Sequence, residues 1–271
     1  MKSLVELLSS AGLTRVQSEI LNSALPSIRL RTQAVDETQQ ELGATHFGGS
    51  PDLPPVYHWP ERGGTPLPFV AQINVSDLVS YDAARVLPTT GRLVFFFDVD
   101  AFFETWPHDP ATWLVCYDTS PLSTLQRVAL PEAIAKRRRY RLCAVACSTE
   151  LTLPDYSQYD PTSLQRLRLS QPLTDEEELA YYAVQEQLAE RTGATHHTPL
   201  HRLLGHPDDV QWDMHDELEG NASDWLLLFQ MDSDGLPDTD WGDTGRIYYW
   251  IRSRDLAAGD FSQTQVILQS T

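Results

Sequence analysis

Two similar segments about 155 residues apart restrict the fold of this chain more than any other feature of its sequence. The first copy contains Gly49-Ser50-Pro51, Phe69–Asn74 and Gly91-Arg92-Leu93-Val94-Phe95-Phe96. The second copy contains Gly205-His206-Pro207, Trp225–Asp232 and Gly245-Arg246-Ile247-Tyr248-Tyr249-Trp250. Pro51 lies 21 positions before Gln72, and Pro207 lies 23 positions before Gln230, so both the order and the spacing agree. Such self-similarity predicts one structural unit that is used twice.

Each copy is predicted to contain a helix, a loop and three strands. Leucines between Leu4 and Leu21 indicate a helix, or a pair of helical turns, interrupted at Gly12. Thr174-Asp175-Glu176-Glu177 is a capping-box pattern that starts a second helix, with Gly193 available for its left-handed C-terminal position. Runs rich in aromatic and β-branched residues predict the strands Phe69–Asn74, Arg92–Asp98, Trp113–Tyr117, Trp225–Asp232, Arg246–Arg252 and Gln265–Gln269.

These elements predict an α+β fold. Internally duplicated helix–loop–three-strand units would form a pseudo-symmetric, mainly antiparallel sheet core, with copy one at about 1–120 and copy two at about 174–271. The connecting segment 121–173 is expected to hold a helix at Pro131–Arg139 and a strand at Tyr140–Leu153. A single domain over 1–271 is favoured over two independent domains, because a three-stranded unit rarely buries enough apolar surface alone.

The charge balance limits the partners that this chain can bind. Its 271 residues include 38 acidic and 20 basic side chains, for a net charge of −18. Nucleic acids and anionic membrane surfaces both attract basic proteins, so neither is expected as a partner. The three cysteines argue against a disulfide framework and fit a reducing compartment. With no secretory signal and no apolar run of about 20 residues, we expect a soluble, cytoplasmic protein.

The acidic residues are concentrated in one region. Residues 203–245 contain twelve Asp or Glu and no Lys or Arg. A solvated acidic surface of this kind can steer a basic partner toward the protein. The candidate partner-binding residues are Asp208, Asp209, Asp213, Asp216 and Glu217.

Metal and cofactor sites are not predicted, although two segments resemble them. Asp232-Ser233-Asp234-Gly235 suggests a calcium loop. The fifth and sixth positions of that loop would be Leu236 and Pro237, which do not fit the EF-hand spacing, so an acidic turn is favoured. Five of the eight histidines lie at His196, His197, His201, His206 and His215. Surface histidines are favoured over a zinc site there, because no helical His-x₃-His pair with a partner Glu is present.

Two glutamines at equivalent repeat positions are the most unusual polar residues of the predicted strands. A glutamine inside a strand must pair its amide, so Gln72 and Gln230 indicate a buried hydrogen bond between the repeats. The alternative is a ligand cleft between the repeats, with Gln72, Gln230, His201, Trp241 and Asp243 as its candidate residues. No catalytic residue is predicted, since neither a nucleophile elbow nor a Ser or Cys with an obvious His partner is present.

Motifs over most of the chain after about residue 28 resemble the YwqG-like family of bacterial proteins, whose functions are largely unknown. The first group of motifs comprises Phe47-Gly48-Gly49-Ser50-Pro51-Asp52-Leu53-Pro54, Trp59-Pro60, Ala71-Gln72-Ile73-Asn74 and Gly91-Arg92-Leu93. The second comprises Leu203-Leu204-Gly205, Gln230-Met231-Asp232-Ser233-Asp234, Trp241-Gly242-Asp243 and Asp260-Phe261. The resemblance implies no catalytic residue, and it implies an immunity function because some relatives are thought to be encoded near toxin genes.

Together these features favour a non-enzymatic protein-binding module. Its expected partner is a protein with a basic surface, and an immunity protein that neutralises a toxin is the concrete form. The alternative is an enzyme or small-ligand-binding protein that uses the cleft between the repeats. Neither hypothesis requires a cofactor.

Overall fold

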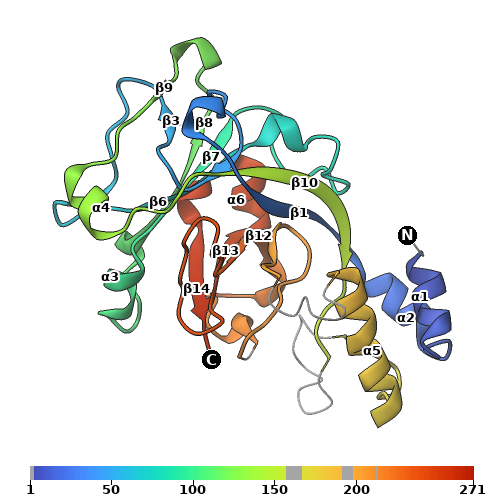
Figure 1. Ribbon diagram of the computed structural model, residues 1–271. Helices are drawn as coiled ribbons and strands as arrows, with labels where there is room; N and C mark the ends of the chain where they lie inside the picture. The colour runs from blue at the N-terminus through green and yellow to red at the C-terminus, as the bar shows by residue number, and fades with distance from the viewer. Residues whose placement is uncertain (1–2, 157–166, 191–197, 212) are drawn as a thin grey trace.

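The computed structural model describes residues 3–156, 167–190, 198–211 and 213–271 (Figure 1). Its α-helices are α1 (Leu4–Ser10), α2 (Gln17–Ser23), α3 (Val99–Phe103), α4 (Glu132–Arg137), α5 (Asp175–Leu188) and α6 (Ser253–Ala258). The long strands are β1 (Leu25–Ala34), β6 (Phe69–Asn74), β7 (Arg92–Phe97), β8 (Trp113–Asp118), β10 (Cys143–Thr152), β12 (Trp225–Asp232), β13 (Arg246–Arg252) and β14 (Gln265–Gln269). The short strands are β2 (His46–Phe47), β3 (Asp52–Leu53), β4 (Glu61–Arg62), β5 (Thr65–Pro66), β9 (Gln126–Arg127) and β11 (His201–Leu203).

The described strands form one ten-stranded sheet with the order β14-β13-β12-β11-β1-β10-β2-β6-β7-β8. Neighbours in this sheet run antiparallel, from Leu25↔Thr152 to Ala34↔Cys143 in the central pair β1–β10. We call β2, β6, β7 and β8 the first wing, and β11 to β14 the second wing. Each wing therefore leaves the central pair through one short strand and continues through three longer ones.

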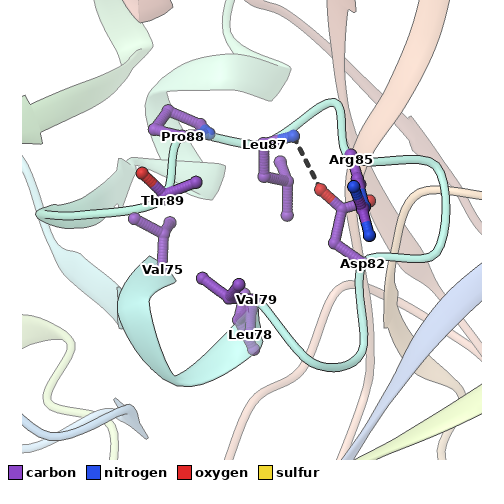
Figure 2. Close-up of a pocket in the computed structure, with 8 residues that line it drawn as sticks. All are labelled: Val75, Leu78, Val79, Asp82, Arg85, Leu87, Pro88 and Thr89. Carbon is purple, nitrogen blue, oxygen red and sulfur yellow. Dashed lines mark hydrogen bonds between the residues drawn. The ribbon is translucent and has the colours of Figure 1, made fainter.

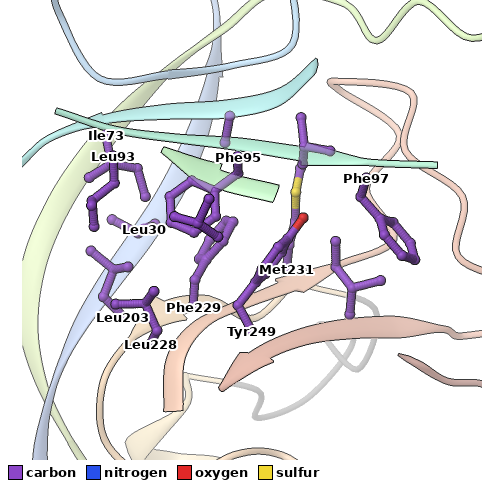
Figure 3. Close-up of a cluster of buried hydrophobic side chains, with 14 of the residues drawn as sticks. Leu30, Ile73, Leu93, Phe95, Phe97, Leu203, Leu228, Phe229, Met231 and Tyr249 are labelled. Carbon is purple, nitrogen blue, oxygen red and sulfur yellow. The ribbon is translucent and has the colours of Figure 1, made fainter. Parts of the chain in front are cut away.

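The two wings curl toward each other and enclose the main core. Figure 3 shows Phe95 of β7 pointing at Phe229 of β12 and Tyr249 of β13. The Phe95 ring centroid lies 4.8 Å from that of Phe229 and 5.0 Å from that of Tyr249. At the outer strands, Trp113 Nε1 donates to the carbonyl of Thr264, just before β14, at 2.9 Å. The sheet is therefore nearly closed, like a barrel, and the predicted α+β, mainly antiparallel fold is confirmed.

The outer face of each wing is also covered, which explains why β7 is buried at all six positions. Leu53 of β3 and Leu67 of the loop before β6 pack on Phe69, Val94 and Phe96 of the first wing. Met214 and Leu218 likewise pack on the second wing, against side chains that include Leu227, Tyr248, Trp250 and Ile267. The long connections between strands are thus a second layer, and strands buried on both faces read as continuous apolar runs.

Three helices form a separate small core beside the central strands. Leu8 of α1, Ile20 of α2, and Tyr181 and Val184 of α5 are fully buried there, and Figure 1 shows the three helices grouped together. Thr174 caps α5 as predicted: its Oγ1 accepts from the Glu177 amide, and Glu177 Oε2 accepts from the Thr174 amide. The predicted end is wrong, because α5 stops at Leu188 and Glu190 takes the left-handed conformation; Gly193 lies outside the described residues.

Four predicted strands have the predicted bounds, namely β6, β12, β13 and β14. The others differ at their ends: β7 ends at Phe97, β8 extends to Asp118, and β10 is shorter than Tyr140–Leu153. The prediction of three strands in each copy was incomplete, because β1, β2 and β11 were missed. Helix α4 spans Glu132–Arg137 within the predicted Pro131–Arg139.

Candidate functional site

Gln72 and Gln230 hold the loops of their own wings. Gln72 Oε1 accepts from the Asp52 amide at 2.8 Å, and its Nε2 donates to the Ala44 carbonyl at 3.1 Å and to Asp52 Oδ2 at 3.3 Å. Gln230 makes the same three bonds to Asp208 and Leu200, at 2.9, 2.7 and 2.9 Å. The expected hydrogen bond between the repeats was therefore wrong, since each amide is satisfied inside its own wing. We call these two arrangements the Gln–Asp clamps.

An arginine pairs with the aspartate of each clamp, but the two arginines come from different strands. Asp52 lies 3.0 Å from Arg127 Nε of β9, whereas Asp208 lies 2.7 Å from Arg202 Nη1 of β11. His46 stands opposite Gln72 in the sheet, as Arg202 stands opposite Gln230. His46 is fully buried, its Nδ1 lies 2.9 Å from the carbonyl of Gly48, and burial lowers its pKa to about 4.

His201 connects the acidic turn after β12 to the sheet. Its Nδ1 accepts from the Asp232 amide at 3.1 Å, so its Nε2 carries the proton and donates to Asp234 Oδ2 at 3.1 Å. Thr32 Oγ1 donates to the same carboxylate oxygen at 2.6 Å. Burial of Asp234 opposes ionisation, but the bonds from His201 and Thr32 outweigh it and lower the pKa of this carboxyl. The cluster therefore fixes the turn, because the Asp234 carboxylate accepts hydrogen bonds from both His201 and Thr32.

The five residues of the predicted cleft do not share one opening. Gln72, Gln230, His201 and Trp241 are each at most 1% exposed. Trp241 Nε1 donates to the Asp232 carbonyl and His201 accepts from the Asp232 amide, so both bond the end of β12, while Gln72 lies in the other wing. Asp243 is exposed, and its carbonyl accepts from the Thr271 amide. Their polar groups therefore serve the internal structure of the protein.

The predicted acidic surface is divided by burial. Asp213 is buried, Asp208 is held in the clamp, Asp209 and Glu217 are half-buried, and only Asp216 of the five is exposed. The fully exposed acids of 203–245 are Asp216, Glu219 and Asp224 before β12, and Asp238, Asp240 and Asp243 after it. Because β12 has eight residues, its two ends, which these groups flank, are about 25 Å apart.

The acidic turn, residues 233–245, is tied to a segment of the connecting region. Arg141 donates its amide to the Pro237 carbonyl at 2.7 Å and its Nε to the Leu236 carbonyl at 3.0 Å. The turn is the one predicted between two strands. Asp232 at the end of β12 and Asp234 in the turn are buried, at 7% and 6% exposure. Arg141 thus draws the turn against residues 138–141.

A row of aromatic rings joins the acidic turn to the segment that follows β7. The Trp241 centroid lies 5.8 Å from that of Phe97, and Phe97 lies 5.3 Å from Phe102 of α3. Phe102 stacks on His108 at 3.6 Å, and His108 meets Trp106 edge-on at 4.8 Å. Figure 1 shows α3 on the same side of the molecule as β14, which follows the turn and β13 in the chain.

The row ends in two aromatic side chains that the protein exposes. Trp106 is 77% exposed and Phe103 is 59% exposed. Their segment is braced: Asp109 accepts from Arg62 Nε at 2.8 Å, its amide donates to Thr105 Oγ1 at 3.0 Å, and His108 Nδ1 lies 2.8 Å from the Phe102 carbonyl. We call Phe103, Trp106, Asp238, Asp240 and Asp243 the aromatic–acidic face. No sequence pattern identified it, although three aromatics within Phe102–Trp106 exceed what one short helix can bury.

A small cavity lies under the loop between β6 and β7. It has a volume of about 250 Å³ and is lined mainly by apolar side chains such as Val75, Leu78 and Leu87 (Figure 2). Asp82 Oδ2 accepts from the Leu87 amide at 2.8 Å and closes this loop. The cavity is therefore a feature of loop packing.

The histidine cluster does not assemble a metal site in the described part of the chain. His206 is partly buried, its Nε2 lies 2.8 Å from the Ser23 carbonyl, and burial lowers its pKa to about 4. His201 is buried in β11, so the expectation of surface histidines was wrong for both. His196, His197 and the side chain of His215 lie outside the described residues. Elsewhere in the described structure, no three His, Cys, Asp or Glu are placed to hold a metal ion.

The comparisons with known proteins identify a family for this chain. A family model described as a domain of unknown function, DUF1963, matches residues 45–270. The chain belongs to this family. The DUF1963 match begins just before β2 and includes both wings and β10, so α1, α2 and β1 precede it. No curated protein matches the chain. Among the described helices of this DUF1963 protein, none is long and apolar enough to cross a membrane.

Proposed function

We propose that this DUF1963 protein binds another protein that has a basic surface, and that the aromatic–acidic face is the contact surface. The observation that carries this proposal is the exposure of Trp106 on a braced segment that a row of ring contacts joins to Trp241 of the acidic turn. A rigid, exposed tryptophan loses little conformational freedom on binding, and tryptophan is enriched among residues that dominate binding energy.

The burial and ion pairing of the basic side chains support the same proposal. Arg29, Arg92, Arg202 and Arg246 are buried, at 1 to 7% exposure. Other arginines form ion pairs at the surface, such as Arg31 with Glu190 and Arg139 with Glu37. Much of the positive charge is therefore enclosed or paired, and the net charge of −18 is expressed mainly by exposed carboxylates. Such a field accelerates association with a basic partner.

An immunity protein that covers the basic active-site cleft of a toxin is the concrete form of this function. It would act in the cytoplasm, in keeping with three free cysteines. The finer family assignment that we propose is YwqG-like, from the motifs described above. The alternative of a catalytic or ligand-binding cleft between the repeats has less support, because Gln72, Gln230 and His201 are bonded internally.

We also propose that the two wings derive from duplication of one unit. The matching Gln–Asp clamps support this origin. So does the backbone that precedes each clamp aspartate: φ is 60° at Gly48 and 70° at Gly49, and 61° at Leu204 and 79° at Gly205. Leucine rarely adopts this left-handed conformation, so its presence at the position of Gly48 favours a retained backbone over coincidence.

The test compares two variants with the same change of charge. One carries Asp238→Asn, Asp240→Asn and Asp243→Asn, and the other carries Asp216→Asn, Glu219→Gln and Asp224→Asn at the opposite end of β12. Both are measured against a partner that the wild-type chain retains from cells of its source. We expect the first variant to associate about tenfold more slowly at low salt, and the second to change much less. Equal effects would leave only the net charge as the cause and would contradict the proposed face.

A further inference from the structure

A groove that is separate from the aromatic–acidic face lies on β10, where the first wing departs from the central pair. Its volume is about 450 Å³, within the usual size of small-molecule sites. The residues that matter for its chemistry are Glu41, Asp77, Tyr81, Ala144, Val145 and Cys147. We call it the β10 groove.

The sheet itself creates the groove. Strand β2 pairs with β10 only at Cys143 and Ala144, among the described residues, whereas β10 continues to Thr152. Beyond Ala144, the edge of β10 that faces the first wing therefore has no described strand beside it. Backbone carbonyls on an unpaired edge remain available as hydrogen-bond acceptors. The floor formed by Ala144, Val145 and Cys147 is otherwise apolar.

The charged side chains of the groove are all negative. Glu41 comes from the segment before β2, and Asp77 from the 3₁₀ helix Val75–Leu78 after β6; both are exposed. Asp77 lies close enough to Cys147 that, after burial, its charge contributes to raising the pKa of that thiol to about 11. No Lys or Arg occurs among the described side chains that line the groove.

Together these properties define the complementary ligand. Two carboxylates and open carbonyls accept hydrogen bonds from a donor-rich cation. The apolar floor favours methylene groups, and the Tyr81 ring can face an ammonium group. We propose that the β10 groove binds a free aliphatic diamine or polyamine. This site is independent of the proposed protein-binding function, and either can fail without the other.

The experiment uses the full chain and three small probes. Cadaverine, 1,5-pentanediol and N-acetyl-lysine methylamide are titrated while amide shifts are followed by NMR. We expect cadaverine to shift the Val145 and Cys147 amides, and the uncharged diol to bind at least about tenfold more weakly. Equal binding of the diol would overturn the proposal, as would cadaverine shifts that avoid β10. Tighter binding of the lysine mimic would overturn it too, because a partner's side chain would then be the better ligand.

Two double variants, each with substitutions at exposed residues, make the test specific. Asp77→Asn combined with Glu41→Gln should weaken cadaverine binding by at least about tenfold, because both charged acceptors become neutral. Asp224→Asn combined with Glu219→Gln removes the same charge in the second wing and should leave the affinity within about twofold. Because both pairs of residues lie at the surface, we expect each variant to remain folded. Thermal unfolding checks this. Unchanged binding by the Asp77 and Glu41 variant would refute the site.

Discussion

Gln72 and Gln230 never meet, yet each makes the same three hydrogen bonds: one from an aspartate amide, one to a carbonyl before a short strand and one to the aspartate carboxylate. The clamp joins a central strand of its wing to the loop that covers the outer face. Both glutamine side chains are fully buried, so their amide groups depend on these partners for hydrogen bonds.

Gln230→Leu is therefore expected to lower the free energy of unfolding by about 3 kcal/mol, because the Asp208 amide and the Leu200 carbonyl lose their partner in a buried place. Urea denaturation measures this change. Gln187→Leu on the exposed side of α5 is the control and should change stability by less than about 0.5 kcal/mol. A similarly small effect of Gln230→Leu would mean that the clamp does not hold the loop.

Thr174→Ala should cost about 1 kcal/mol of stability, because the Glu177 amide loses its cap at the start of α5. Thr174→Ser keeps the hydroxyl and should be close to the wild type. The effect should appear as a lower Tm with α5 still folded, since Tyr181 and Val184 keep α5 packed on α1 and α2. Equal stability of the alanine and serine variants would show that the capping box is dispensable.

The buried histidines predict a loss of stability in mild acid. The folded pKa values of His46 and His206 are lowered to about 4, below an unfolded value of 6.5. Between these values the unfolded chain binds more protons, so stability is complete above about pH 6.5 and falls as the pH approaches 4. Each histidine can contribute on the order of 3 kcal/mol to this change. Denaturation at a series of pH values measures it.

His206→Gln is the matching variant for the pH prediction, because a glutamine amide can still donate to the Ser23 carbonyl without titrating. We expect its stability to fall less steeply between pH 6.5 and 4.5 than that of the wild type. Asp234, whose pKa is lowered, affects stability only at more acidic pH, so it does not obscure this window. A slope identical to the wild type would contradict the burial of a neutral imidazole.

The sequence predicted strands that carry a long apolar run, such as β12, or an alternating pattern, such as β10, and it missed strands that have neither. β12 and β13 were recognised by aromatic and aliphatic runs. β1 was missed because Pro26, Arg29 and Arg31 interrupt its pattern; Arg29 is nevertheless 1% exposed, near Glu150 of β10. β2 and β11, with two and three residues, are too short for any periodic signal.

The candidate site was harder to predict, because exposure depends on the whole fold. Asp208 and Asp213 looked like part of a solvated run, but Asp208 pairs with Arg202 and Asp213 is buried. The sequence led to no prediction for Trp106 or Phe103, because aromatic side chains are usually buried and no pattern shows which of them are exposed. Their neighbour Phe102 is 1% exposed and packs on Phe97, which in turn contacts Trp241, more than 100 positions away in the chain.

The account is tested most directly by the dissociation constant of the complex between the partner and the Trp106→Ala variant. Truncating a dominant interface tryptophan costs about 2 kcal/mol or more, which corresponds to at least about thirtyfold weaker binding. Val56→Ala, at a position that is 80% exposed in the loop between β3 and β4, is the control and should bind like the wild type. The account predicts a thirtyfold loss for Trp106→Ala with unchanged Tm. Wild-type affinity of Trp106→Ala would contradict the aromatic–acidic face as the binding surface.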